Sequence, residues 1–260
     1  MDPVALITGA SSGIGKALAD VFASEGYQLI LVARTESALV QISRSVESTY
    51  GRHAEVIVKD LSERAAAETI FRIVQEQGIS LDVLVNNAGL GDYGPFHRTD
   101  WDKTQKMLDV NITALTHLTR LFLPGMILRH RGHILNIAST AGFMPGPLMS
   151  VYYASKAYVL HFSEAVADEL RGTGVGVTAF CPGPVKTSFQ AAASKGEISP
   201  ARGRTLATAD EVARDAFNAM TAQDVVHVQG FLNYCFSLFP RFVPRSLVRR
   251  ITHSVQERRG

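Results

Sequence analysis

Short apolar runs of strand type alternate with longer amphipathic stretches along most of the chain. The expected strands cover residues 4–7, 28–32, 55–58, 81–85, 133–137, 175–180 and 225–228. Their almost continuous apolar character is typical of parallel strands that helices cover on both faces. The expected helices cover residues 14–25, 36–49, 62–77, 100–129, 150–171 and 209–222, with one or two short helices after residue 231. This alternation predicts an α/β fold with a doubly wound, seven-stranded parallel sheet flanked by helices.

The length of 260 residues and the 46% of hydrophobic residues fit one large globular domain. We expect this domain to span residues 1–230, followed by an extension over residues 231–260. Residues 188–206 are small, polar and punctuated by glycine and proline, and they follow the sixth strand. A long loop beyond the carboxyl end of a parallel strand is predicted to form a substrate lid.

Charge and cysteine content exclude several classes of protein. A formal net charge of +2 does not favour nucleic acid as a partner. Cys181 and Cys235 form neither a CxxC pair nor part of a His/Cys cluster, so we expect no disulfide framework and no metal site. Because the first residues lack a signal-peptide pattern and residues 231–243 are too short to span a bilayer, we expect a cytoplasmic protein.

A glycine-rich segment joins the first strand to the first helix. Gly9, Gly13 and Gly15 stand where a tight turn brings backbone amides against a phosphate at a helix N-terminus. A glycine-rich turn that binds nothing is the alternative for a motif taken alone. The full string TGASSGIG, residues 8–15, is more specific and resembles the cofactor-binding turn of classical short-chain dehydrogenases/reductases.

The resemblance continues in order along residues 4–228 and implies a Rossmann-type, dinucleotide-binding domain. Asp60 matches the aspartate that binds the adenine amino group. The segment NNAG at residues 86–89 matches the one whose backbone lies against the cofactor, and the PGxxxT stretch at residues 182–187 matches the one that contacts the nicotinamide end. The cofactor-binding residues implied are Thr8, Gly9, Ser11, Ser12, Gly13, Ile14, Gly15, Arg34, Thr35, Asp60, Leu61, Asn87, Ala88, Gly89, Tyr152, Lys156, Pro182, Gly183, Val185 and Thr187.

The end of the second strand indicates which cofactor is bound. NAD-linked members of the family usually carry an aspartate where this chain has Ala33, and Arg34 follows it. A 2′-phosphate would meet a cation there and no carboxylate, which favours NADP(H). The second basic residue that the family often carries inside the glycine turn is absent, because Ser12 occupies that position.

Tyr152 and Lys156 lie four residues apart on an expected helix, so their side chains share one face. A cation held close to a tyrosine favours its ionised form and makes it a usable general acid or base. Spacing alone does not choose between Tyr152 and Tyr153, whereas the family's YxxxK motif selects Tyr152. The resemblance also assigns Ser139 as the donor to the substrate oxygen, Asn111 as the support of a proton relay, and Lys156 as a ligand of the nicotinamide ribose.

These residues predict an NADP(H)-dependent oxidoreductase that moves hydride between the nicotinamide and a carbonyl or secondary alcohol carbon. Apolar residues in the loops near 89–96, 141–150 and 188–206, such as Phe143 and Met144, favour a hydrophobic small molecule. One alternative is an NAD-linked alcohol or hydroxysteroid dehydrogenase. Another is a catalytically silent protein that senses NADP, although none of the four catalytic residues is missing.

The extension combines aromatic residues with arginines. Six arginines and one glutamate fall within the last twenty residues, so this segment carries a formal net charge of +5. Such a segment packs on its own domain, meets a neighbouring subunit or lies on an anionic membrane. Because Pro240 and Pro244 interrupt a continuous apolar face, we favour packing over peripheral membrane contact. The family resemblance implies a homodimer or homotetramer that assembles through the long helices near 100–129 and 150–171.

Overall fold

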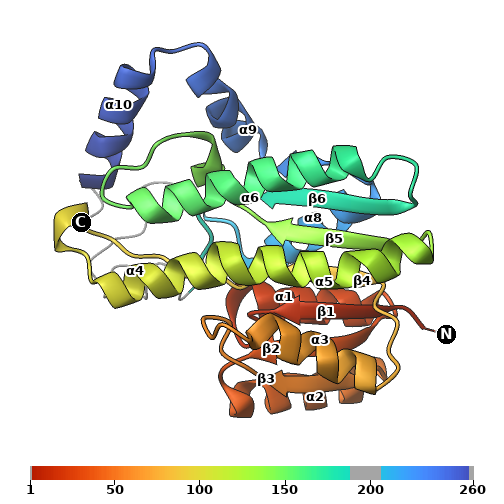
Figure 1. Ribbon diagram of the computed structural model, residues 1–260. Coiled ribbons are helices and arrows are strands. Elements are labelled where there is room, and N and C mark those ends of the chain that lie inside the picture. Colours follow the sequence, from red (N-terminus) through yellow and green to blue (C-terminus); the bar gives the residue numbers. More distant parts are fainter. Residues whose placement is uncertain (1, 188–205, 258–260) are drawn as a thin grey trace.

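Seven parallel strands form the centre of the computed structural model, which describes residues 2–187 and 206–257 (Figure 1). The strands are β1 (Val4–Thr8), β2 (Gln28–Ala33), β3 (Ala54–Val58), β4 (Val83–Asn86), β5 (Gly132–Ile137), β6 (Val175–Cys181) and β7 (Val226–Val228). Their order in the sheet is β3-β2-β1-β4-β5-β6-β7. The doubly wound parallel sheet predicted from the alternation of the sequence is therefore confirmed.

Helices cover both faces of this sheet (Figure 1). The helices of the described residues are α1 (Gly13–Ser24), α2 (Glu36–Tyr50), α3 (Ala66–Glu76), α4 (Trp101–Leu108), α5 (Leu115–Leu128), α6 (Ser150–Glu169) and α8 (Ala209–Thr221), followed by α9 (Phe231–Leu238) and α10 (Arg245–Glu257) of the extension, which lie away from the sheet. Successive side chains of a strand point to opposite faces, so Ile7 packs in one core with Phe22 of α1 and Phe217 of α8. Leu6 packs in the other core, with Ile70 of α3 and Leu118 of α5.

The strand order reverses beside β1, which pairs with β2 on one side and β4 on the other. In an open α/β sheet, ligands bind beyond the carboxyl ends of the strands at such a switch point. The turns that leave β1 and β4 carry the segments at residues 8–15 and 86–89. The topology therefore brings these two motifs together.

The single helix expected over residues 100–129 is wrong in one respect. The chain forms α4, then a π-helical segment Asp109–Ala114, and then α5. The wider turn contains Asn111, whose buried side-chain amide donates to the Leu90 carbonyl at 2.9 Å and to the Ser155 hydroxyl at 3.0 Å. Hydrophobic periodicity does not reveal one extra residue in a turn, and π-helical turns often occur at functional sites.

The helix expected over residues 62–77 begins later, at Ala66 in α3. The carboxylate of Asp60 accepts hydrogen bonds from the backbone amide and the hydroxyl of Ser62, both at 2.9 Å. This local turn occupies the residues that would otherwise extend the helix.

The extension forms α9 and α10, which Figure 1 shows as two arms of a V joined at the outer edge of the molecule. Three residues of α10 are buried: Val248, Thr252 and Gln256. The expected lid, residues 188–206, lies outside the described residues except for Leu206. Within the described ranges, none of the helices combines the length and apolar character that crossing a membrane requires.

Candidate active site

The turn between β1 and α1 is shaped for close approach of another molecule. Gly9 and Gly13 have positive φ angles of 66° and 54°, which glycine adopts at little cost. A Cβ atom on Gly15 would overlap the carbonyl oxygen of Gly9. At Gly13 a Cβ would stand 3.3 Å from Cγ2 of Thr187, so the PGxxxT stretch reaches the same turn. Any larger side chain at these glycines would fill or distort the cradle.

The N-terminus of α1 is suited to an anion. Ser12 is the N-cap residue, its side chain makes no capping hydrogen bond, and the first turn of α1 contains no acidic residue. The first amides of a helix point outward, and the helix dipole adds partial positive charge. Together with the glycine turn, this end of α1 fits the phosphates of the predicted dinucleotide.

Thr8 and Asn87 hold the turn against β4. The Thr8 hydroxyl donates to the Val85 carbonyl at 3.1 Å and accepts from the Asn87 amide at 3.0 Å. The side-chain amide of Asn87 in turn donates to the Thr8 carbonyl at 2.8 Å. Thr8 therefore does not line the cavity but fixes the backbone of the glycine-rich turn against the end of β4.

The predicted adenosine end of the site lies where β2 and β3 end. Arg34 is largely exposed, with 63% of its side-chain surface accessible, and its guanidinium is 4.0 Å from the carboxylate of Asp60. Burial raises the pKa of Asp60, but hydrogen bonds from Ser62 and the nearby Arg34 outweigh it and lower the pKa overall. Lys59 lines the same cavity, although its ammonium pairs with Glu63 at 2.5 Å. A cation is thus available at this end for a phosphate.

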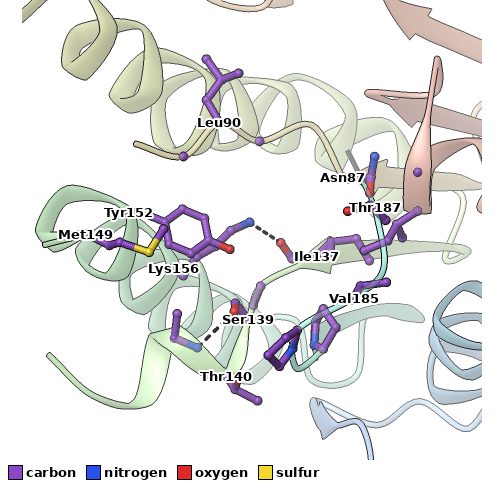
Figure 2. Close-up of a pocket in the computed structure, with 18 of the residues that line it drawn as sticks. Asn87, Leu90, Ile137, Ser139, Thr140, Met149, Tyr152, Lys156, Val185 and Thr187 are labelled. Carbon is purple, nitrogen blue, oxygen red and sulfur yellow. Dashed lines mark hydrogen bonds between the residues drawn. The ribbon is translucent and has the colours of Figure 1, made fainter. Parts of the chain in front are cut away.

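The predicted catalytic side chains converge at the ends of β5 and α6 (Figure 2). The hydroxyl of Ser139 forms a hydrogen bond with the hydroxyl of Tyr152 and accepts from the amide of Ala141 at 3.1 Å. The ammonium of Lys156 donates to the carbonyl oxygen of Ile137 at 2.7 Å. The structure therefore brings a serine, a tyrosine and a lysine to one wall, as the sequence predicted.

Burial dominates the ionisation of this group. It raises the pKa of Tyr152 to about 12, against a smaller lowering by the hydrogen bond from Ser139. Burial also lowers the pKa of Lys156 to about 8. The predicted lowering of the Tyr152 pKa by Lys156 is not among these causes, and the ammonium of Lys156 donates to Ile137.

Asn111 lies behind this wall. Its side-chain oxygen accepts a hydrogen bond from the amide of Leu90 at 2.8 Å, while its side-chain nitrogen donates to the Leu90 carbonyl and to the Ser155 hydroxyl. A Cβ on Gly89 would stand 3.6 Å from the Asn111 oxygen and 3.7 Å from the Lys156 nitrogen. Asn111 and Lys156 therefore both lie near Gly89, and Asn111 also fixes the segment that follows the NNAG motif.

One cavity of about 650 Å³ joins the glycine turn, the adenosine end and the catalytic wall. Of the predicted site residues, only Thr8 and Asn111 do not line it. The others that line it are Gly9, Ser11, Ser12, Gly13, Ile14, Gly15, Arg34, Thr35, Asp60, Leu61, Asn87, Ala88, Gly89, Ser139, Tyr152, Lys156, Pro182, Gly183, Val185 and Thr187.

The loops expected to wall the pocket contribute only in part. From the segment 89–96, only residues 89–91 line the cavity, and Phe96 is exposed. Met144 and Met149 line it, whereas Phe143 packs against the core beside α6. Within the described residues, no cluster of His, Cys, Asp and Glu side chains could hold a metal ion.

The sequence predicts that the extension packs on the domain, with a final helix over the pocket as one possibility, but it does not identify the residues that reach the cavity. The lining includes Tyr153 and, from α9 to α10, Asn233, Phe236, Phe239, Val248, Ile251, Thr252, Val255 and Gln256. The spacing of residues 248, 252 and 256 marks one buried helical face and could have indicated packing, but the partner of that face depends on the tertiary fold.

Comparison with known proteins gives consistent matches. A family model described as short chain dehydrogenase matches residues 3–198. A very-long-chain 3-oxoacyl-CoA reductase of Anas platyrhynchos is 33% identical over 263 residues, which covers 98% of this chain and 81% of that protein. An NADP-dependent 3-hydroxy acid dehydrogenase of Salmonella typhi is 37% identical over 204 residues, which covers 78% of this chain and 80% of that protein.

Among solved structures, a short-chain dehydrogenase from Sphingobium yanoikuyae in complex with NADPH superposes with a TM-score of 0.83. The two chains are 29% identical, and the match covers 92% of this chain and 93% of the other. The two proteins therefore share their fold over most of both chains.

Proposed function

This chain belongs to the short-chain dehydrogenase/reductase family, and from that premise we propose that it interconverts a hydrophobic ketone and the corresponding secondary alcohol with NADP(H). The family assignment makes it an NADP-dependent oxidoreductase acting on CH–OH and C=O groups. The observation that carries the proposal is the hydrogen-bonded pair of Ser139 and Tyr152, which shares one cavity with the glycine cradle.

Two observations support NADP(H) as the cofactor. The relative from Salmonella typhi is named NADP-dependent, and the matching structure from Sphingobium yanoikuyae contains NADPH. In this chain Arg34 lines the adenosine end, while Ala33 places no carboxylate there to repel a 2′-phosphate. The bound cofactor supplies the hydride.

The chain's own residues orient the carbonyl and move the proton. Ser139 donates a hydrogen bond to the carbonyl oxygen of the substrate, and Tyr152 gives its proton to the same oxygen during reduction. Lys156 holds positive charge beside the tyrosinate that this transfer leaves. Asn111 keeps the Leu90 backbone and Ser155 in place behind Lys156. In alcohol oxidation the same residues work in reverse.

The substrate end of the cavity supports an apolar molecule. Met144, Met149, Phe236, Ile251 and Val255 line it on the side away from the glycine turn. The polar side chains of Tyr153, Asn233, Thr252 and Gln256 also line the cavity. An apolar lining that carries several polar groups is usual in a pocket for a hydrophobic ligand, where the polar groups orient it.

A panel of carbonyl compounds of increasing apolar size, followed by oxidation of NADPH, tests this function. We expect turnover with NADPH to exceed turnover with NADH, and kcat/KM to rise with apolar size. An enzyme that prefers NADH would favour the alternative NAD-linked alcohol or hydroxysteroid dehydrogenase. Binding of NADPH without turnover of any carbonyl would favour the silent sensor.

We also propose assembly into a homodimer or homotetramer through α5 and α6. On the outer side of α6, Tyr158 stacks on Phe162 with ring centroids 5.7 Å apart, and its hydroxyl lies 2.9 Å from the hydroxyl of Thr116. Tyr158 is 37% exposed. This ordered aromatic surface suits contact with a second copy, and sedimentation velocity tests it.

A further inference from the structure

We propose that the connection between α9 and α10 docks on an anionic lipid membrane. The docking surface is the apex of the V in Figure 1, residues 241–247, and we call it the α9–α10 apex. The proposal adds an interaction surface to the enzyme and reverses the preference that the sequence alone gave for a purely packing role.

The α9–α10 apex exposes large apolar side chains. Phe242 is 82% accessible and Leu247 is 46% accessible. Phe239, which comes just before the apex, is 38% accessible. Clustered exposure of this kind marks an interaction surface, whereas scattered apolar residues are normal. Phenylalanine and leucine beside basic residues are the composition of segments that lie in a membrane interface.

The charge around the apex is of one sign. Arg241, Arg245, Arg249 and Arg250 are all exposed, and the sequence has no aspartate or glutamate from residue 225 to residue 256. None of these four arginines forms an ion pair with another described residue. Basic residues at the rim of an apolar surface attract the phosphates of anionic lipids.

The contact of α10 with the domain does not cover the α9–α10 apex. Val248, Thr252 and Gln256 on the inner face of α10 are buried, so contact with the domain uses that face. A symmetric contact with a second copy would bring like-charged apices together, which is unfavourable. An anionic surface complements the charge without that cost.

The cavity opens beside the apex. Phe236, Phe239, Ile251 and Val255 line the cavity and are nevertheless 38–50% exposed, so its apolar wall reaches the surface between α9 and α10. Docking would hold this opening against the lipid, from which an apolar substrate could enter without crossing water. This consequence rests on the proposed function, whereas the docking itself does not.

Co-sedimentation with vesicles tests the docking. The intact chain should bind vesicles of phosphatidylcholine with phosphatidylglycerol, fail to bind phosphatidylcholine alone, and release as salt rises. Changing Arg241→Ser together with Arg245→Ser should lower the partition coefficient roughly 30-fold. Phe242→Ser should lower it as well. Arg44→Ser with Arg64→Ser removes two exposed arginines elsewhere and is the matched control, which should bind nearly as the unchanged chain does.

Measuring carbonyl reduction in the same variants distinguishes failure of the docking proposal from failure of the proposed function. Reduction of a water-soluble ketone with NADPH should be unchanged in the apex variants, because residues 241, 242 and 245 do not line the cavity. An active enzyme that ignores anionic vesicles would overturn the docking and leave the function intact. Apex variants that lower the mass in sedimentation velocity, without vesicle binding by the unchanged chain, would instead identify a contact between copies. Vesicle binding by a chain that reduces no carbonyl would contradict the proposed function alone.

Discussion

The side-chain amide of Gln256 in α10 donates to the hydroxyl of Tyr153 at 2.6 Å. The backbone carbonyl of Gln256 also accepts from the hydroxyl of Tyr93 at 3.0 Å. Two tyrosines from separate parts of the chain therefore hold the end of α10 beside the cavity. Tyr152 and Tyr153 are neighbours with ring centroids 6.1 Å apart, yet one faces Ser139 and the other holds the extension.

Replacement Gln256→Leu keeps the side-chain volume but removes the donor to Tyr153. The loss of one hydrogen bond is worth roughly 0.5–1.5 kcal/mol, so we expect KM for a large apolar substrate to rise about 2- to 13-fold. The dissociation constant of NADPH should not change, because Gln256 lies at the substrate end. Steady-state kinetics and an NADPH titration measure both. Ser254→Ala, at an exposed position of the same helix, is the control. Equal weakening of substrate and NADPH would disprove the local role.

Replacement Arg34→Ala should weaken NADPH binding and spare NADH. A charge-assisted hydrogen bond to a phosphate is worth roughly 1.5–3 kcal/mol, or about 10- to 150-fold in affinity. The pairing of Arg34 with Asp60, at 4.0 Å and largely exposed, is weak enough to yield to a phosphate. Adding Ala33→Asp should shift the preference further toward NADH.

Titration of both cofactors by fluorescence checks the role of Arg34, with Arg44→Ala on α2 as a control of equal charge. Parallel losses for NADPH and NADH would show that Arg34 does not read the 2′-phosphate.

Replacement Lys156→Met should inactivate the enzyme and stabilise the fold near neutral pH. Burial lowers the pKa of Lys156 from 10.5 to about 8, so below pH 8 the folded state carries a costly buried charge. The buried charge lowers the free energy of unfolding by about 3 kcal/mol. Lys156→Met removes this cost but also loses the hydrogen bond to Ile137, which is worth about 1 kcal/mol. We therefore expect a gain of about 2 kcal/mol at pH 7.

The stability difference between Lys156→Met and the unchanged chain should depend on pH. The cost is complete below the folded pKa and disappears as pH rises from about 8 toward the unfolded value of 10.5. The advantage of Lys156→Met should accordingly shrink over this range. Urea unfolding without cofactor, at several pH values, measures it. A variant that is less stable at pH 7 would show that the hydrogen bond of Lys156 outweighs its desolvation.

The sheet and most of the residues that line the cavity could be predicted from the sequence, because each strand and each motif is formed by residues that are adjacent in the sequence. The apolar runs set the strands, and the glycines of the first turn require conformations that glycine adopts readily. Features that depend on distant contacts were not predictable. The buried side chain of Asn136 accepts from Asn86 at 2.9 Å and donates to Ser163 at 2.8 Å, which joins two strands to α6 without any sequence motif.

The substrate end depends still more on tertiary structure. The contact of Gln256 with Tyr153 spans 103 positions in the sequence, so periodicity could place Gln256 on a helical face but could not identify what that face covers. The π-helical segment at Asp109–Ala114 likewise follows from the contacts of Asn111.

The central claim is that Tyr152 transfers the proton while its neighbour Tyr153 holds the extension. Single-turnover reduction of a carbonyl substrate, with Tyr152→Phe and Tyr153→Phe compared at equal NADPH saturation, tests it most directly. Removing a general acid typically costs about 10²- to 10⁴-fold in rate, so Tyr152→Phe should lose turnover and keep NADPH affinity. Tyr153→Phe should keep most of the rate and change mainly KM. A Tyr152→Phe enzyme that remains active, beside a Tyr153→Phe enzyme that does not, would contradict the account.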